Sequence, residues 1–555
     1  MCGIWVLLGR LRSEHHAEFL KIVGRGPDLT VLDDPRPDAW LGFHRLAIVE
    51  PGDQPSEQPI YHAGAAVVCN GEIYNHLAIK EDSGVDEESV INGGSDCAAI
   101  LHAFRKHKGD LAATCADLDG VFAFAMVDGD YLHLGRDPIG VRPLFYGFSE
   151  KGEFLAGSEV KSIERLCRSV NYFPPGCCAT VPINNAHAFD IKQYYSLPTI
   201  ADRRLPVLSA QAAVCQTLIQ AVEKRLMADR RFGFMLSGGL DSSLIASIAM
   251  KFVKPGAPKP VAFSVGFADS PDLVNAAAVA QYLEIPHEIL VITPEDCIKA
   301  IPEVVYALET FDPFIVRCGV AHYLLCKHIA ASSDVKVLLS GEGADELFGS
   351  YAYMQRAPTA AHLHREMVRR LDLLHHYDVL RCDRATSCHG LEIRVPFLDK
   401  KFIDLVARLP AHYKLMRDTM EKFMLRSAFE GWLPDQVLWR SKEGFSEALG
   451  KSDLSEVIGE HVAQLISDDQ FAERMARFPS KCPETKEEYW YRMIFERCYN
   501  YKKLATILHT KVYRTAAWQL PEEKENCKDS LLVVDPLPMR IRRRSTGSHS
   551  VSVTA

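Results

Sequence analysis

Short apolar runs separated by turn residues dominate the first 195 positions. The runs lie at residues 4–8, 40–49, 66–69, 121–127 and 131–134. Runs of this length are typical of β-strands, and the Asp128-Gly129 pair between the last two is a common hairpin turn. One helix is predicted over residues 95–108, where Ile100, Leu101 and Phe104 can share a face. The pattern therefore predicts an antiparallel, strand-rich first domain at residues 2–195.

The periodicity changes near residue 209. Val214, Leu218, Val222 and Leu226 repeat every four residues, which predicts an amphipathic helix with Ser209 as its N-cap. Helical segments such as 272–283 then alternate with apolar runs at 232–236, 261–267, 289–292 and 335–339. Such alternation is typical of a parallel sheet with helices on both faces. We expect a second domain over residues 209–520, a linker at 196–208 and a flexible tail at 521–555.

The composition narrows the class of protein. The 555 residues include 63 Lys and Arg against 72 Asp and Glu, a net charge of −9, which argues against nucleic acid as a partner. The longest strongly apolar runs are too short to span a membrane, and the start of the chain lacks a secretory pattern. The sixteen cysteines show no paired CxxC spacing, so we expect a soluble cytoplasmic protein with no membrane partner. Whether it forms a homodimer is left open.

The chain begins Met1-Cys2-Gly3. Removal of Met1 leaves a thiol and an α-amino group on Cys2. Since an α-amino group titrates near pH ~8, it can act as a base for the thiol of its own residue, as the amine of an N-terminal Thr nucleophile does for its hydroxyl. A lone Cys at this position is more often incidental, so the catalytic interpretation depends on further motifs.

Five further motifs follow Cys2 in order: RGPD at 25–28, GFHRLAIV at 42–49, NGEIYN at 70–75, SD at 95–96 and GRD at 135–137. With Cys2 they resemble class II glutamine amidotransferases. The resemblance implies that Arg45 and Asp96 hold the α-carboxylate and α-amino group of glutamine, while Asn70 and Gly71 form the oxyanion hole for Cys2. It also assigns to the glutamine site Leu46, Ala47, Ile48, Val49 and Glu72.

A glycine-rich loop, SGGLDSS at 237–243, joins a predicted strand to a predicted helix. Backbone N–H groups in such a loop can bind phosphate oxygens with help from the helix dipole. The Lys of a Walker motif is missing, and an ordinary strand–helix turn is the plainer alternative. The sequence SGGLDSS instead resembles the pyrophosphate loop of ATP pyrophosphatases, which cleave ATP between its α and β phosphates.

An acidic loop, SGEGADELF at 340–348, follows the strand predicted at 335–339. Its carboxylates need cations or solvent, because they cannot enter an apolar core unpaired. A solvated turn would satisfy them, but Mg²⁺ is often held by one or two carboxylates plus phosphates. We therefore predict Asp241 and Asp345 as Mg²⁺ ligands, since both loops lie at the carboxyl ends of strands.

Further motifs extend the resemblance along most of the chain: DRAT at 383–386, HGLEIRVPFLD at 389–399, WRSKEGFS at 439–446 and the segment 485–499. Together with the two loops they resemble glutamine-hydrolysing asparagine synthetases. This family implies an N-terminal Ntn-hydrolase αββα sandwich and a C-terminal doubly wound α/β ATP-pyrophosphatase domain with a helical extension. It also implies ATP-dependent amidation of aspartate through β-aspartyl-AMP, with ammonia channelled from glutamine.

The family assigns the remaining site residues. Glu342 matches a carboxylate that forms and uses the adenylate, Lys442 a lysine that stabilises its charges, and Arg317 an aspartate-binding arginine. ATP is expected to contact Leu236, Ser237, Gly238, Gly239, Asp241, Ser242, Val265, Ser340 and Gly341.

The sequence departs from the family pattern at two places. The family commonly has His before RGPD, where this chain has Gly24, a change expected to loosen the packing around Arg25. Two threonines that help to hold aspartate become Phe314 and Ile315. An enzyme that amidates a different carboxylate, or a catalytically silent homologue, therefore remains an alternative to asparagine synthesis.

Overall fold

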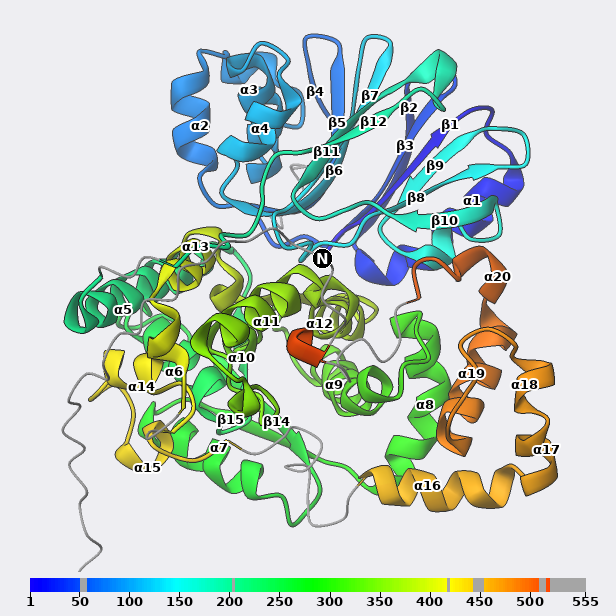
Figure 1. The fold of residues 1–555 in the computed structure, drawn as a ribbon. Coiled ribbons are helices and arrows are strands. Elements are labelled where there is room, and N and C mark those ends of the chain that lie inside the picture. The colour runs from blue at the N-terminus through cyan, green and yellow to red at the C-terminus, as the bar shows by residue number, and fades with distance from the viewer. Residues whose placement is uncertain (50–56, 202–204, 417–419, 443–453, 509–515, 520–555) are drawn as a thin grey trace, which may run out of the picture.

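The computed structural model describes residues 1–49, 57–201, 205–416, 420–442, 454–508 and 516–519. A strand-rich N-terminal domain lies against a larger, mostly helical C-terminal domain, above it in Figure 1. The predicted tail at 521–555 lies outside the described residues, as do residues 443–446 of the WRSKEGFS motif.

Two six-stranded antiparallel sheets form the N-terminal domain. The first has the order β10 (Cys167–Tyr172), β8 (Phe145–Ser149), β9 (Phe154–Gly157), β1 (Gly3–Leu8), β3 (Ala39–Arg45) and β2 (Leu29–Arg36). The second has the order β12 (Asp190–Gln193), β11 (Cys177–Pro182), β7 (Tyr131–Arg136), β6 (Gly120–Asp128), β5 (Ala65–Ile73) and β4 (Ile60–His62).

Strand β1 shows why the sheets are sandwiched between helices. Ile4 and Val6 pack between the two sheets, whereas Trp5 and Leu7 point to the other face and pack with Phe19. Both faces of β1 are therefore apolar and buried, as the alternation of side chains along a strand requires. Helix α1 (Ser13–Phe19) and the 3₁₀ helix η1 (Leu20–Arg25) cover the first sheet. The second is covered by α2 (His76–Ser83), α3 (Ala99–Lys106) and α4 (Leu111–Asp117). This is the predicted αββα arrangement.

A five-stranded parallel sheet organises the C-terminal domain. Its order is β15 (His287–Val291), β14 (Val261–Gly266), β13 (Phe232–Met235), β16 (Val337–Leu339) and β17 (Glu392–Arg394). One face packs on α5 (Val207–Lys224), α6 (Leu240–Met250), α7 (Pro271–Tyr282) and α13 (Lys400–Arg408). The other face packs on α9 (Pro313–Ser332), which contributes Leu325, Cys326 and Ile329. Helices on both faces confirm the predicted α/β class.

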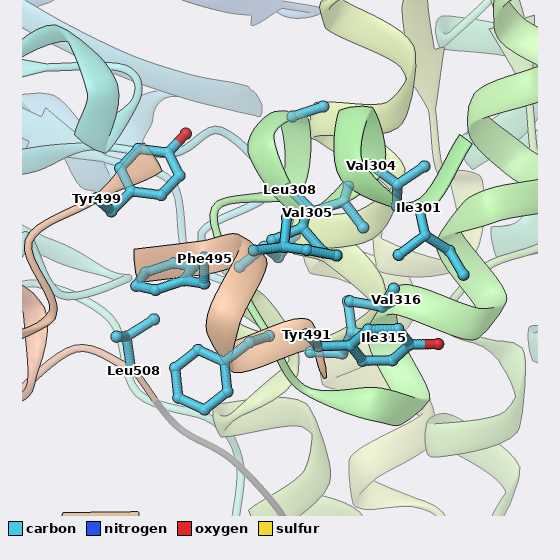
Figure 2. Packing of buried hydrophobic residues seen from close by; sticks show 14 of the residues in the cluster. Ile301, Val304, Val305, Leu308, Ile315, Val316, Tyr491, Phe495, Tyr499 and Leu508 are labelled. Carbon is cyan, nitrogen blue, oxygen red and sulfur yellow. The ribbon is translucent and has the colours of Figure 1, made fainter. Parts of the chain in front are cut away.

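A helical extension completes this domain. It comprises α16 (Leu454–Leu465), α17 (Asp468–Ala472), α18 (Arg474–Arg477), α19 (Lys486–Cys498) and α20 (Tyr501–Leu504). Figure 2 shows Phe495 of α19 beside Val305 and Leu308 of α8 (Pro294–Leu308), and Tyr491 of α19 beside Ile315 and Val316 of α9. This apolar contact attaches the extension to α8 and α9. Among the described residues, the C-terminal domain also contains the α-helices α10 (Ala344–Phe348), α11 (Ala360–Asp372), α12 (Asp378–Ser387), α14 (Phe423–Ala428) and α15 (Asp435–Leu438).

Buried ion pairs join the two domains. The Arg25 guanidinium lies 2.6 Å from Glu159 and 2.8 Å from Asp383 of α12, and it is 1% exposed. A Cβ on the neighbouring Gly24 would lie 2.9 Å from the Cys388 carbonyl oxygen of the other domain. The expectation that Gly24 loosens the packing around Arg25 is therefore wrong, because the glycine permits a close approach of the two domains.

Several element boundaries differ from the predictions. The strand predicted at 40–49 ends at Arg45, and the following residues leave the sheet. Helix α5 starts at Val207 after Pro206, so Ser209 lies inside the helix and is not its cap. The short strand β17 was not predicted, since three buried residues carry no periodicity of their own.

Helix α9 is a long apolar segment that was not predicted from the sequence. Its 20 residues have the length and mean hydropathy of a membrane span, yet 61% of the apolar stretch is buried inside the protein. It packs against α8 and α12.

Candidate functional site

Cys2 precedes β1 and faces the residues that follow β3. Its sulfur accepts a hydrogen bond from the Leu46 backbone N–H at 3.4 Å. Burial raises the pKa of the Cys2 thiol to about 11. Burial also lowers the pKa of the Met1 amine to about 6, and this amine donates to the Leu391 carbonyl at 3.3 Å. While Met1 is present, the Cys2 nitrogen is a peptide group that cannot serve as a base.

The predicted oxyanion-hole residues lie on β5. Asn70 is fully buried, and among the described residues its side-chain nitrogen and oxygen have no hydrogen-bond partner. A Cβ on Gly71 would lie 2.2 Å from the Val121 carbonyl oxygen of β6, so only glycine permits this approach of the strands. A buried amide without a partner is costly. The Asn70 amide is therefore available to a bound ligand.

Asp96 stands at the start of a 3₁₀ helix, η3 (Asp96–Ala98), and accepts a hydrogen bond from the Ile73 N–H at 2.6 Å. Burial raises its pKa to about 6. Arg45 ends β3, and its guanidinium donates to the Val49 carbonyl at 3.3 Å. Ala47 is held by its N–H bond to Asp28 at 2.7 Å. The other predicted residues of this stretch, Leu46 and Ile48, are buried.

Glu72 takes part in a contact between the domains. Its Oε2 lies 3.5 Å from Nη2 of Arg394 in β17. The Arg394 carbonyl in turn accepts the Ser340 N–H at 3.0 Å. One residue of the predicted glutamine site is thus connected through a single arginine to the acidic loop of the other domain.

The glycine-rich loop lies between β13 and α6, as predicted. Gly238 has φ +72°, and a Cβ there would lie 2.4 Å from the Ala276 nitrogen. Gly239 is the N-cap residue of α6. The hydroxyls of Ser237 and Ser242 lie 3.1 Å apart and close the loop. The N–H groups of Ser237 and Gly239 donate to the hydroxyls of Ser242 and Ser237. The loop ends at the N-terminus of α6, where an anion can bind.

Two lysines, one of them buried, bridge the acidic residues. The side chain of Lys422 is 2% exposed. Its ammonium group contacts Asp241 and lies 2.6 Å from Asp345. Lys442 reaches the other oxygen of Asp345 at 3.0 Å. Burial alone would raise the pKa of Asp345, but Lys422 and Lys442 hold it below its ordinary range. Burial raises the pKa of Asp241 despite Lys422. Lys422 was not predicted as a site residue, because it lies outside every motif that the sequence analysis singled out.

A pocket of about 360 Å³ collects most of the predicted synthetase residues. Glu342 lies on it, and its Oε1 accepts from Arg381 of α12 at 2.7 Å. Burial raises the pKa of Glu342. The other predicted residues that line it are Leu236, Ser237, Asp241, Ser242, Val265, Ser340, Gly341, Asp345 and Lys442.

A smaller pocket of about 110 Å³ adjoins it beside the glycine-rich loop. Gly239 lines this pocket together with three cationic residues that the sequence did not single out, Lys422, Arg426 and Arg440. Its charge suits a polyphosphate group.

Arg317 is not among the residues that line either pocket. Its guanidinium donates to the Pro313 carbonyl at 3.2 Å and lies 3.4 Å from Glu487 of α19. Phe314 does line the large pocket, whereas Ile315 is buried in the core beside α19. The structure therefore separates Arg317 from the other predicted residues and places Arg381 on the pocket instead.

Comparison with known proteins covers both domains. Residues 1–181 match the family described as glutamine amidotransferase domain, and residues 213–362 and 355–523 match the family described as asparagine synthase. The glutamine-hydrolysing asparagine synthetase of Rattus norvegicus is 36% identical over 534 residues, which cover 90% of this chain and 94% of that protein. The Homo sapiens protein of the same name is 36% identical over 533 residues, with the same coverage. Asparagine synthetase 3 of Arabidopsis thaliana is 36% identical over 520 residues, 90% of this chain and 87% of that protein.

An amidotransferase sandwich joined to a nucleotide-binding α/β domain defines a glutamine-dependent carbon–nitrogen ligase. The family models match residues of both domains, and the relatives align over 90% of the chain. This chain belongs to the asparagine synthase family.

Proposed function

We propose that the protein makes asparagine from aspartate, with ATP as the energy source and glutamine as the nitrogen donor. Glutamine and water give glutamate and ammonia in the N-terminal domain. In the C-terminal domain the β-carboxylate of aspartate attacks the α-phosphorus of ATP and releases pyrophosphate. Ammonia then displaces AMP from the acyl phosphate and loses a proton. Relatives do not favour the two alternatives, a different acceptor acid or a silent homologue.

For glutamine hydrolysis we assign the nucleophile to Cys2 after removal of Met1. The freed α-amino group then takes the thiol proton, and the sulfur attacks the glutamine side-chain amide to form a thioester. The orphaned amide of Asn70 and the N–H of Gly71 stabilise the oxyanion, and each such donor supplies about 3 kcal/mol. Arg45 and Asp96 hold the charged ends of glutamine.

For adenylation we assign the triphosphate to the glycine-rich loop and to the cations of the smaller pocket. Lys442 stabilises negative charge that develops on the α-phosphate, and Glu342 accepts the proton that incoming ammonia must lose. The observation that carries the proposal is the convergence of Asp241, Asp345 and Lys442 on the large pocket, where Lys422 of the adjoining pocket contacts both carboxylates.

We infer that Mg²⁺ accompanies ATP on Asp241 and Asp345. The buried Oδ1 of Asp241 has no hydrogen-bond partner among the described residues, and within them no group of three or more His, Cys, Asp or Glu side chains forms a closed metal cage. Two carboxylates with phosphates are a common Mg²⁺ environment. When bound, the ion neutralises charge on the phosphates.

We further propose a cytoplasmic location. Each cysteine within the described residues is a free thiol, which suits a reducing compartment.

One assay tests the whole proposal. Purified protein with aspartate, ATP, MgCl₂ and glutamine is expected to form asparagine, AMP, pyrophosphate and glutamate in equal amounts. Omission of aspartate should stop AMP formation. If AMP formed at the same rate without aspartate, or not at all with it, the proposed synthetase reaction would be wrong.

A further inference from the structure

The first turn of α12 presents two charged side chains to the large pocket. Asp378 and Arg381 are one helical turn apart and both line it. Nη2 of Arg381 lies 3.0 Å from Oδ1 of Asp378 and 2.7 Å from Oε1 of Glu342. One guanidinium therefore serves two carboxylates, and this corner of the pocket can accept a further positive charge.

The second oxygen of Asp378 lacks a partner. Asp378 is 7% exposed, and its Oδ2 has no hydrogen-bond partner within the part of the chain that the structure describes. Arg370 is the other nearby guanidinium, but it stacks over the rings of Tyr351 and Tyr377 at 5.2 and 5.5 Å and is not a lining residue. A buried carboxylate oxygen with no donor is costly unless a ligand supplies one.

The other acidic residues on the pocket already have cations. Asp345 contacts Lys422 and Lys442, Glu342 contacts Arg381, and Asp272 lies 3.1 Å from Arg440. Asp241 contacts Lys422 and belongs to the phosphate loop. Asp378 is thus the carboxylate on this wall, away from that loop, with an oxygen left to bind an ammonium group.

The neighbouring helix α9 contributes no charged side chain to the pocket. Phe314 and Cys318 of α9 line the same pocket, while Arg317 is directed to Glu487. Recognition of a charged acceptor therefore depends on α12 more than on α9.

We propose that Asp378 binds the α-ammonium group of the amino-acid acceptor and so selects an α-amino acid over the corresponding dicarboxylic acid. The inference rests on the proposed function, because it assigns a residue to the acceptor of that reaction. Arg381 positions Asp378 and Glu342, and Asp378 is the residue that touches the substrate.

The test compares aspartate with succinate, which keeps both carboxylates and lacks the ammonium group. Pyrophosphate release is measured with ammonium chloride as the nitrogen source. Asp378→Asn is expected to raise KM for aspartate about 10- to 100-fold, the range for a lost charged hydrogen bond. The inhibition constant of succinate against aspartate should stay within about twofold, and Asp378→Glu should restore part of the aspartate affinity.

Controls keep the outcomes separate. Asp372→Asn removes an exposed carboxylate at the end of α11 and should leave every constant unchanged, and glutaminase activity reports on folding of each variant. If Asp378→Asn weakened the binding of aspartate and of succinate equally, or raised KM only for ammonia, the inference would be overturned. A wild-type protein that releases no pyrophosphate with aspartate would instead contradict the proposed function.

Discussion

The ammonium group of Lys422 contacts both Asp241, which follows β13, and Asp345, which follows β16. The two loops touch elsewhere too, since a Cβ on Gly341 would lie 2.7 Å from Cβ of Asp241. A lysine from a distant segment therefore links the loops that follow two adjacent parallel strands through ion pairs. These ion pairs lie at the carboxyl ends of the strands, where open α/β sheets usually bind ligands.

Replacement of Lys422 tests whether its ion pairs with Asp241 and Asp345 are needed for the synthetase reaction. Lys422→Met should lower the rate of aspartate-dependent pyrophosphate release by about 100-fold or more, because it leaves two partly buried carboxylates without their common cation. Glutaminase activity should stay within about twofold. Lys327→Met, at a lysine of α9 that is 55% exposed, serves as the control. Unchanged pyrophosphate release in Lys422→Met would show that Lys422 has no role at the phosphates.

The terminal thiol can be tested independently of the synthetase site. Cys2→Ala should abolish hydrolysis of glutamine and leave asparagine formation from ammonia at the parental rate, because the C-terminal pocket contains no part of Cys2. The measurement is glutamate release alongside ammonia-dependent AMP formation. Cys215→Ala on α5 is the matched control, and it should retain both activities. Glutamate release by Cys2→Ala at the parental rate would exclude Cys2 as nucleophile.

The raised pKa of Asp96 predicts a pH dependence for glutamine use. Burial raises this pKa from 3.8 to about 6, so the folded protein keeps the neutral acid where an exposed Asp is ionised. Since the ammonium group of glutamine needs the carboxylate, kcat/KM for glutamine should rise as the pH increases through about 6. The same shift means that the contribution of Asp96 to folding stability is largest below pH 3.8 and is lost as the pH rises toward 6.

Glutaminase kinetics between pH 5 and 8 provide the measurement. Asp96→Asn should remove the rise near pH 6 and raise KM for glutamine. If kcat/KM for glutamine still rose near pH 6 in Asp96→Asn, the titration would belong to another group.

The close approach at Gly24 predicts a change in stability. Gly24→Ala should lower the free energy of unfolding by about 1–3 kcal/mol, the usual cost of overpacking, because its Cβ would meet the Cys388 carbonyl at 2.9 Å. Urea denaturation measures the change. Gly459→Ala in α16 is the control, since a Cβ there meets nothing within 4 Å and alanine favours a helix. Equal effects of the two substitutions would contradict the interpretation.

The amino-acid sequence was sufficient for features whose geometry is local. The SGGLDSS loop could be recognised because a strand, a glycine turn and a helix start are consecutive in the chain, and the apolar run at residues 4–8 predicts the strand β1. The same holds for the two fold classes, which the spacing of apolar runs and helical segments predicts.

Contacts between segments that are far apart in the sequence could be identified only from the tertiary structure. Lys422 meets Asp241 across 181 positions, and Arg317 turns to Glu487 although its motif suggested a place on the pocket. The close approach of Gly24 to Cys388 and the position of Asp378 on the pocket depend on which faces of helices and loops pack together. Local propensity does not encode such a choice, because it follows from the shape and charge of the neighbour that each segment meets.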